Sequence, residues 1–181
     1  MADASVRPAT TGDAPAIARL QGAVWSQVYA DLLPAETFDD IASGDGVATW
    51  ERAVGSPPSP RHRVLVALAG DELIGFAALA PASDPDLVAA LDAELHSFCV
   101  APDRTRRGHG SRLVNASVDV LRAAGFAHLH VWLTDREAQL RSFLEKAGWA
   151  DDGARRSLDL RGDGEVLADQ VRLRTSIADP A

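Results

Sequence analysis

A single cysteine, Cys99, occurs among the 181 residues of the sequence. The chain can therefore form neither an intrachain disulfide nor a metal site built from several cysteines. No apolar run approaches the roughly 20 residues that span a bilayer. The N-terminus also lacks the basic and then apolar segments of a signal peptide. We therefore expect no membrane-spanning segment and, by default, a cytoplasmic location.

Positive charge is also scarce. The sequence has 18 Lys and Arg residues against 26 Asp and Glu residues, which gives a net charge of −8 and a pI near 5.0. Nucleic acids and anionic membranes are bound through excess positive charge, so neither is an expected partner. The acidic balance mildly favours a cationic acceptor such as an amine, although a surface that is acidic for solubility explains it at least as well.

The length and composition indicate one globular domain. A hydrophobic content of 46% and a charged content of 24% are ordinary for a soluble protein. The chain is long enough for one sizeable core and too short for two, so we expect a single domain over residues 1–181 with its core at about 6–174. Both a monomer and a homodimer are compatible with this expectation.

Predicted strands and helices alternate along the chain. Residues 63–69 and 72–80 are apolar runs around Gly70-Asp71, which indicates a β-hairpin. The other expected elements are a strand at Val6, helices at 17–28, 35–41, 47–54 and 137–147, a strand at 127–134, and a terminal hairpin at 158–160 and 166–173. This alternation predicts an α/β domain around a mixed sheet.

A bulged strand is expected in the middle of the chain. Its apolar residues Leu95, Phe98 and Val100 are spaced three and then two apart, so the period of two is broken once. One inserted bulge residue would produce that break, and a bulge frees backbone N–H and C=O groups that can bind a ligand. An irregular end of a buried strand would also explain the spacing.

A helix is expected to begin at the glycines that follow this strand. Gly108 and Gly110 precede an apolar stripe at helical spacing, formed by Leu113, Val114, Ser117, Val118 and Leu121. Glycines at a helix N-terminus allow close approach to unpaired N–H groups, which favour phosphate. Cationic charge surrounds this opening, from Arg104, Arg106, Arg107 and Arg112.

Two other phosphate motifs are excluded. A dinucleotide fingerprint would need a third glycine where Leu113 stands, and a P-loop would need Gly-Lys-Ser/Thr, which the sequence lacks. The segment 100–113, Val-Ala-Pro-Asp-Arg-Thr-Arg-Arg-Gly-His-Gly-Ser-Arg-Leu, instead resembles the central motif of the GCN5-related N-acetyltransferases (GNAT), Gln/Arg-x-x-Gly-x-Gly/Ala. Thr105 stands at the Gln/Arg position. The resemblance extends from Val6 to about Arg174.

The resemblance implies a single-domain GNAT-like fold, a mixed central sheet with a bulged fourth strand flanked by helices. It implies acetyl-CoA as co-substrate, no metal, and a small-molecule or peptide amine as acceptor. The bulged strand would hold the donor through Phe98, Cys99 and Val100. The pyrophosphate would lie against Arg106, Arg107, Gly108, His109, Gly110 and Ser111.

Glu94 stands where the family often places its base, just before the bulged strand, and could deprotonate the amine through a water. A surface glutamate at a strand start is the alternative. Trp25 and Tyr29 lie four apart on the first predicted helix. They are either a core pair or a wall of the acceptor site, as the first helices are in this family.

One departure from the family lies in the predicted helix at 137–147. Family members commonly carry Asn-x-x-Ala-x-x-Phe-Tyr-x-x-x-Gly-Phe, whose tyrosine protonates the departing thiolate. Here Glu137 and Leu144 stand at the Asn and Tyr positions, while Phe143, Gly148 and Trp149 keep the frame. A non-catalytic acyl-CoA-binding regulatory module is therefore the alternative function. A third possibility, an enzyme that acts on nucleotide phosphates, fits poorly, because the sequence lacks a suitably placed lysine or carboxylate pair.

The histidines carry weaker signals. His128 and His130 share one face of the predicted strand at 127–134, a spacing that a metal could use. Without a third ligand within reach in the sequence, we expect packing beside Trp132 instead. For His96 and His109, a packed or solvent-facing role is favoured over a catalytic one.

Overall fold

The computed structural model describes residues 4–178, which form one seven-stranded sheet in the order β1-β2-β3-β4-β5-β7-β6. The strands are β1 Ala4–Pro8, β2 Arg63–Ala69, β3 Glu72–Pro81, β4 Asp92–Val100, β5 His128–Thr134, β6 Ala150–Asp159 and β7 Leu167–Ser176. Neighbouring strands are antiparallel except for β4 and β5, which are parallel. The sheet is therefore mixed, as predicted.

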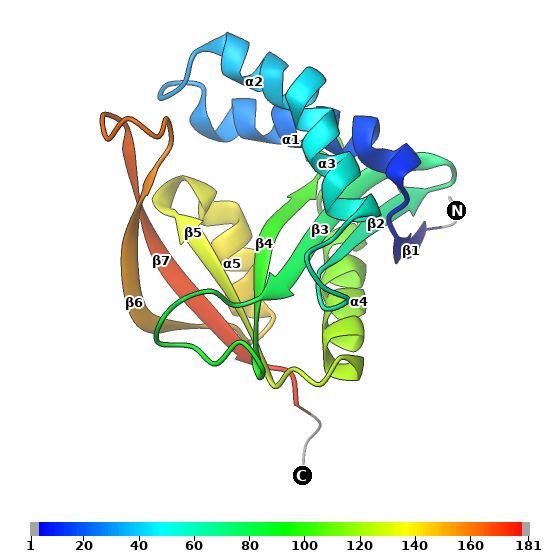
Figure 1. Cartoon of the computed structure of the whole chain (residues 1–181), viewed down its shortest axis with the longest axis vertical. Coiled ribbons are helices and arrows are strands. Elements are labelled where there is room, and N and C mark those ends of the chain that lie inside the picture. The colour runs from blue at the N-terminus through cyan, green and yellow to red at the C-terminus, as the bar shows by residue number, and fades with distance from the viewer. Residues whose placement is uncertain (1–3, 179–181) are drawn as a thin grey trace.

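Helices cover both faces of this sheet (Figure 1). The α-helices are α1 Ala14–Tyr29, α2 Ala35–Ala42, α3 Gly44–Gly55, α4 His109–Ala123 and α5 Ala138–Lys146. Three short 3₁₀ turns connect elements, η1 Thr11–Asp13, η2 Pro102–Arg104 and η3 Asp135–Glu137. α1, α2 and α3 lie on one face, and α4 and α5 lie on the other. The α/β architecture predicted from the alternation of elements is confirmed.

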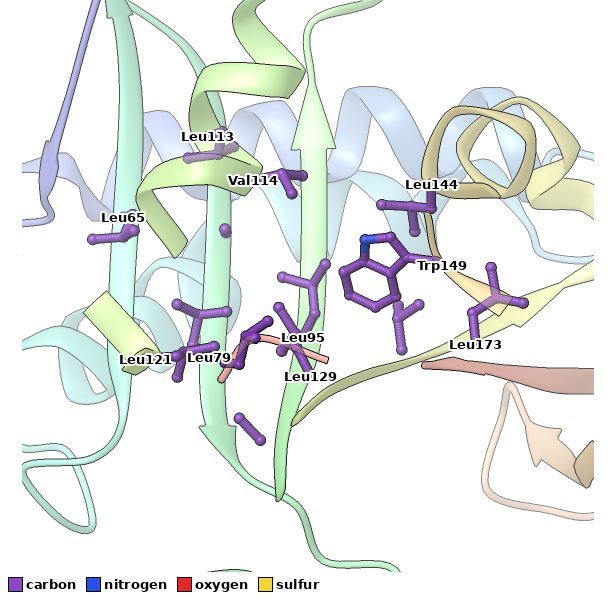
Figure 2. Packing of buried hydrophobic residues seen from close by; sticks show 14 of the residues in the cluster. Leu65, Leu79, Leu95, Leu113, Val114, Leu121, Leu129, Leu144, Trp149 and Leu173 are labelled. Atoms are coloured by element: carbon purple, nitrogen blue, oxygen red, sulfur yellow. The ribbon is translucent and has the colours of Figure 1, made fainter. Parts of the chain in front are cut away.

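The largest apolar cluster lies between the sheet and the helices α4 and α5 (Figure 2). The apolar stripe predicted for α4 supplies Leu113, Val114 and Leu121, which are buried against strand residues. From α5, Leu144 is fully buried and packs in the same cluster as Trp149. Burial on this scale, at about 25 cal/mol per Å² of apolar surface, holds both helices to the sheet.

The opposite face carries two further clusters. One joins α1 and α3 to the sheet, with Trp50 of α3 against Phe76 of β3 at a ring-centroid distance of 5.0 Å. The other joins α1 to α2 and contains Tyr29, Leu33 and Phe38. The C-terminal end of α1 is thus fixed separately from its N-terminal half.

The start of α1 is anchored to the first strand. Asp13 precedes the helix and accepts hydrogen bonds from Arg7 Nη1 at 2.8 Å and from the Thr10 backbone N–H at 2.7 Å. Pro15 lies in the first turn, where its fixed φ suits a helix.

Two strand boundaries differ from the sequence prediction. β4 begins at Asp92, so Glu94 lies inside the strand and not before it. β6 begins at Ala150, well before Leu158, and its pairing with β7 is irregular between Asp151 and Arg155. That irregularity removes the simple alternation by which strands are recognised. Over residues 4–178, no helix is long and apolar enough to cross a membrane.

Candidate active site

β4 and β5 are paired over only a short distance. Their parallel ladder comprises Asp92 with His128, Ala93 with Leu129, and Glu94 with His130. Beyond this point β5 remains paired with β7 to Thr134, while β4 stays with β3 to Val100. Within residues 4–178, no strand therefore pairs with the β5-facing edge of residues 95–100. Figure 1 shows the two strands diverging.

A bulge occurs in β4 at the start of this divergence. Leu79 of β3 pairs with Leu95, and the preceding residue, Ala78, pairs with Ser97. His96 is thus the inserted residue, and it has no partner in β3. The insertion lets Leu95 and Phe98 both pack against the α4 and α5 cluster. The predicted bulge is confirmed.

Glu94 is buried immediately before the bulge, with 5% of its side chain exposed. Its Oε1 atom lies 3.5 Å from Nδ1 of His96, and its Oε2 atom has no hydrogen-bond partner in the described part of the chain. Unsatisfied buried oxygens are uncommon in proteins. An available acceptor atom therefore sits where β4 and β5 separate, and the surface position considered for Glu94 is wrong.

The glycines lie at the N-terminus of α4, as predicted. Gly108 has φ of 81°, a left-handed conformation that favours glycine, and it directly precedes the helix. Gly110 lies beside the stacked rings of Phe98 and Phe143, whose centroids are 6.2 Å apart. A Cβ atom added at Gly110 would lie 3.5 Å from Phe143, an ordinary contact. Gly108 is needed for its backbone shape, whereas Gly110 leaves a small open space.

The entrance to α4 is positively charged. Arg104 is paired with Glu72 at 2.7 Å. Among the described residues, no carboxylate lies within 4 Å of Arg106, Arg107 or Arg112. The pKa of His109 is lowered by partial burial and by the charges of neighbouring arginines. The helix start thus combines free N–H groups with unpaired guanidinium groups, an arrangement suited to an anion.

Cys99 lies on β4 with its side chain in the apolar cluster below α1 and α3. It is buried, and burial raises the pKa of its thiol to about 12. The negative charge of Glu137 contributes to the same rise, after burial. The side chain of Cys99 is therefore packed inside the protein, and only its backbone is placed to meet a ligand.

Tyr29 reaches from the end of α1 to the end of β5. Its hydroxyl lies 3.4 Å from Oγ1 of Thr134 and 3.5 Å from Oε2 of Glu137. Burial, and then the charge of Glu137, raise the pKa of Tyr29 to about 12. Burial likewise raises the pKa of Glu137. Trp25 lies edge-on to Tyr29 at 5.8 Å and is half-buried.

Thr134 and Glu137 were missed by the sequence reasoning. Glu137 Oε2 accepts hydrogen bonds from the Thr134 N–H at 2.8 Å and from its hydroxyl at 3.1 Å. The spacing Thr-x-x-Glu is that of a helix capping box, so the local contact was visible in the sequence. The proximity of Thr134 and Glu137 to Tyr29 was not visible there.

A pocket of about 220 Å³ lies next to Thr134 along the chain. It is lined by Leu32, Asp135, Arg136, Leu167, Ala168 and Asp169.

A charged network on the same face of the sheet was also missed. Arg172 of β7 is 4% exposed and donates to Asp86 at 2.5 Å and Asp152 at 2.7 Å. Asp84 accepts from the Trp132 indole N–H at 2.9 Å. These contacts fasten the loop between β3 and β4 onto β5, β6 and β7.

The two histidines of β5 belong to this polar face. His130 is buried and lies 2.9 Å from Asp92 Oδ1, and His128 lies 3.1 Å from the same atom. Within the described ranges, no group of three or more His, Cys, Asp or Glu side chains could hold a metal ion. The packed position expected for His130 is found, with Asp92 as a partner that the sequence did not suggest.

The structure brings most of the expected site residues together. Glu94 and the backbone of residues 98–100 follow one another along the free edge of β4, which leads through residues 106–111 into α4. Tyr29 lies on the β5 side of the divergence, with Trp25 behind it. Leu144, in contrast, is fully buried in the apolar cluster, so its position in α5 provides no proton donor (Figure 2).

Comparison with known proteins assigns the family. Residues 25–149 match the model of the acetyltransferase (GNAT) family. No curated protein matches the sequence. Similar folds occur in a GCN5-related N-acetyltransferase from Rhodopseudomonas palustris (23% identity, 97% of each chain covered, TM-score 0.70) and in the PaiA N-acetyltransferase of Thermoplasma acidophilum in complex with coenzyme A (18%, 96% of this chain and 99% of that chain, 0.71).

A third similar structure is the ribosomal-protein-alanine N-acetyltransferase of Brucella melitensis (21% identity, 95% of this chain and 99% of that chain, TM-score 0.70). Identities this low relate the folds alone. The family model, in contrast, covers well over half of the sequence. The chain therefore belongs to the acetyltransferase (GNAT) family.

Proposed function

We propose that this acetyltransferase moves the acetyl group of acetyl-CoA to an amine at the point where β4 and β5 diverge. The observation that carries the proposal is the edge of residues 95–100, which no strand pairs within residues 4–178 and which leads into a helix N-terminus with arginines that have no carboxylate partner in the same range. The N–H and C=O groups of such an edge can bind the amide-containing arm of acetyl-CoA. The helix start suits its pyrophosphate. The coenzyme A complex of the similar Thermoplasma protein supports the same donor.

The donor would be held mainly by backbone groups. Phe98, Cys99 and Val100 would bind the arm through their N–H and C=O groups, while the side chains of Phe98 and Cys99 pack in the two apolar clusters. Gly108 gives the loop its turn. The absence of a side chain at Gly110 would let the phosphates approach the backbone closely. The remaining residues of the phosphate loop would be Arg106, Arg107, His109 and Ser111. Acetyl-CoA supplies a thioester, whose carbonyl carbon is open to attack by an amine.

Glu94 would act as the base. A lysine-like amine has a pKa near 10.4 and is mostly protonated at neutral pH, so it must lose a proton before it attacks. The Oε2 atom of Glu94, which has no hydrogen-bond partner in the described part of the chain, would accept that proton, directly or through a water. A backbone N–H of residues 98–100, freed from β5, would stabilise the negative charge that develops on the carbonyl oxygen.

The acceptor would approach along the end of α1. Trp25 and Tyr29 form the wall on this side, and the 220 Å³ pocket beside Thr134 offers a route of entry. The pocket is lined by Asp135 and Asp169 and by one arginine, Arg136, which is paired with Asp31, so its charge suits a cationic amine. Both small amines and peptide amines fit this description, including a protein N-terminus of the kind named for the Brucella enzyme.

Calorimetry with acetyl-CoA, followed by turnover with a panel of amines, tests the proposal. The panel contains small polyamines, amino sugars, peptides with a free N-terminus and lysine-containing peptides. Released coenzyme A can be measured as free thiol, because the protein's own cysteine is buried. We expect binding of acetyl-CoA and turnover of at least one amine. Absence of binding would overturn the proposal, and binding without turnover across the panel would indicate a regulatory acyl-CoA-binding module.

A further inference from the structure

Glu94, the proposed base, is held only weakly by its own contacts. Its Oε1 atom lies 3.5 Å from Nδ1 of His96, beyond the usual N–H···O range of about 2.7–3.2 Å. Among residues 4–178, no donor reaches Oε2, and 48% of the His96 side chain is exposed. A general base acts only within hydrogen-bond reach of the proton that it removes. The orientation of the Glu94 carboxylate is therefore set by the side chains packed beside it.

His130 is the neighbour of Glu94 on β5. The two residues are partners in the parallel ladder, where adjacent strands lie about 4.8 Å apart. Leu95 follows Glu94 in β4, Leu129 precedes His130 in β5, and both leucines pack against α4 and α5. Because side chains alternate along a strand, Glu94 and His130 both lie on the opposite face, toward α1. The imidazole ring and the carboxylate are therefore side by side.

The ring of His130 is fixed from both sides of β5. On the β4 side, its Nε2 atom lies 2.9 Å from Oδ1 of Asp92. On the β6 side, its Nδ1 atom lies 3.8 Å from Oδ2 of Asp152, and this oxygen accepts a hydrogen bond from Arg172 Nε at 2.7 Å. Only 1% of the His130 side chain is exposed. The ring thus has little freedom to turn.

Asp92 is a firm anchor for this ring. Burial disfavours its charged form, but hydrogen bonds from His130 and from the Val88 N–H outweigh burial and lower the pKa of the Asp92 carboxyl. Asp92 is thus a carboxylate at neutral pH, and a carboxylate only accepts hydrogen bonds. Nε2 of His130 therefore carries a hydrogen, which it donates to Oδ1 of Asp92.

We propose that His130 is a positioning residue for Glu94, and that its ring, held between Asp92 and Asp152, sets the direction in which the Glu94 carboxylate meets the acceptor amine. This inference rests on the proposed function. Glu94 and His130 form the last pair of the ladder, where β4 and β5 begin to separate (Figure 1). Apolar side chains of similar volume would join the strands there at least as well as a buried histidine and aspartate. A role in positioning the base gives this polar contact a function.

Loss of the His130 donor should slow acetyl transfer without weakening donor binding. A displacement of about 1 Å in a catalytic group can cost about 100-fold in rate, so even a partial shift of Glu94 should lower kcat at least tenfold. The affinity for acetyl-CoA should stay within twofold of wild type, because residues 98–100 and 106–111 form the proposed donor site. Turnover of an accepted amine, followed as released thiol, gives kcat, and calorimetry gives the affinity.

The test compares two amides that differ by one methylene. In His130→Gln, the side-chain N–H group reaches about as far as Nε2 of histidine and can donate to Asp92, whereas in His130→Asn it falls short. We expect His130→Asn to lower kcat at least tenfold, and His130→Gln to keep kcat within threefold of wild type. Val131→Ala is the control, because the next residue of β5 is buried on the opposite face. It should lower stability to urea without changing kcat.

A double-mutant cycle shows whether His130 acts through Glu94. In a protein that already carries Glu94→Gln, the base is absent, so His130→Asn should lower kcat by no more than a further twofold. Equal losses with and without Glu94→Gln would show a general structural role and overturn the inference. A His130→Asn protein with kcat within twofold of wild type would also overturn it, as would a His130→Gln protein as slow as His130→Asn.

A second variant serves if His130→Asn does not fold, as judged by circular dichroism. Asp152→Asn removes the carboxylate on the β6 side of the ring and should lower kcat at least threefold, but not in the Glu94→Gln protein. No loss, or an equal loss in both proteins, would overturn the inference. Failure of the proposed function looks different, because the wild-type protein would then release no coenzyme A with any amine of the panel.

Discussion

The Nδ1 atom of His96 lies 3.5 Å from Oε1 of Glu94, next to the bulge that His96 itself creates. The two side chains differ sharply in exposure, with 48% of His96 and 5% of Glu94 accessible to solvent. His96 therefore links a buried carboxylate to the surface. In the proposed reaction, this contact gives the proton taken up by Glu94 a path to bulk water.

Replacement of Glu94 by Gln should lower kcat/KM for an accepted amine by about 100-fold or more, the usual contribution of a general base. The change keeps the size of the side chain and removes its ability to take up a proton. Measurement of kcat/KM against pH should also show loss of the acidic limb. Glu51→Gln, on the exposed surface of α3, is the control. A wild-type rate with an unchanged acidic limb would remove Glu94 from the mechanism.

Gly110 allows the phosphate loop to be tested by graded substitution. Gly110→Ala adds a Cβ atom at ordinary contact distance from Phe143, so the variant should fold and bind acetyl-CoA within a few-fold of wild type. Gly110→Val adds two more carbons at the start of α4, beside the rings of Phe98 and Phe143. If the phosphates bind at this helix start as proposed, the larger side chain should weaken binding at least tenfold, or about 1.4 kcal/mol. Calorimetry measures both affinities. Equal affinities in a folded Val variant would place the phosphates elsewhere.

The variant Trp25→Ala tests whether the Trp25 side chain contacts the acceptor or only packs against the protein. Because the side chain is only half-buried, we expect a loss of stability of about 1–2 kcal/mol, smaller than for a core tryptophan. The KM of the acceptor should rise several-fold, while the KM of acetyl-CoA stays constant. Leu33→Ala, in the same cluster as Tyr29, should reduce stability alone. If Trp25→Ala destabilises the protein without changing the acceptor KM, its role is packing.

The thiol of Cys99 should be inert in the folded protein. Only the thiolate reacts with disulfide reagents, and burial raises the pKa of this thiol to about 12. At pH 8 we expect Ellman's reagent to modify Cys99 at least 100-fold more slowly in the native protein than in urea. The reaction is measured by absorbance. A rapid reaction in the native protein would show that β4 opens readily below α1.

Asp13→Asn tests the anchor at the start of α1. Hydrogen bonds from Arg7 are the main cause that lowers the pKa of Asp13 in the folded protein. Its contribution to stability is therefore present above the unfolded pKa near 3.9 and is lost as the pH falls below it. At pH 6 the variant should be less stable by about 1–2 kcal/mol. Urea unfolding should show this difference shrinking toward pH 2.

The ion pair of Asp119 and Arg122 provides the control for Asp13→Asn, because it is exposed, with 75% of the Asp119 side chain accessible. Asp119→Asn should change the unfolding free energy by less than about 0.5 kcal/mol at any pH. If Asp13→Asn behaves in the same way, Arg7 and Asp13 do not stabilise the fold.

The features that the sequence predicted best are those encoded by near neighbours. The spacing of Leu95 and Phe98 indicated the bulge because side chains in a strand alternate with a period of two. Gly108, followed by the apolar stripe of α4, marked the start of a helix in the same way. Each of these patterns spans only a few residues, and the bulge and the helix start were both found where expected.

The contacts that the sequence did not predict join distant segments. Tyr29 and Glu137 are 108 residues apart, and Arg172 and Asp86 are 86 residues apart. Such pairs leave no periodic pattern, because they depend on how the strands are ordered in the sheet. The order β5-β7-β6 brings Arg172 beneath the loop that carries Asp86. A lone arginine and a loop aspartate have no signature before that order is known.

The short ladder between β4 and β5 makes the sheet mechanically uneven. Three residue pairs join these strands, whereas seven join β3 to β4 and seven join β5 to β7. We therefore expect the sheet to bend most easily between β4 and β5. A molecule bound between these two strands would limit that bending. Binding should then slow amide hydrogen exchange at residues 92–94 and 128–130, on both strands of the short ladder.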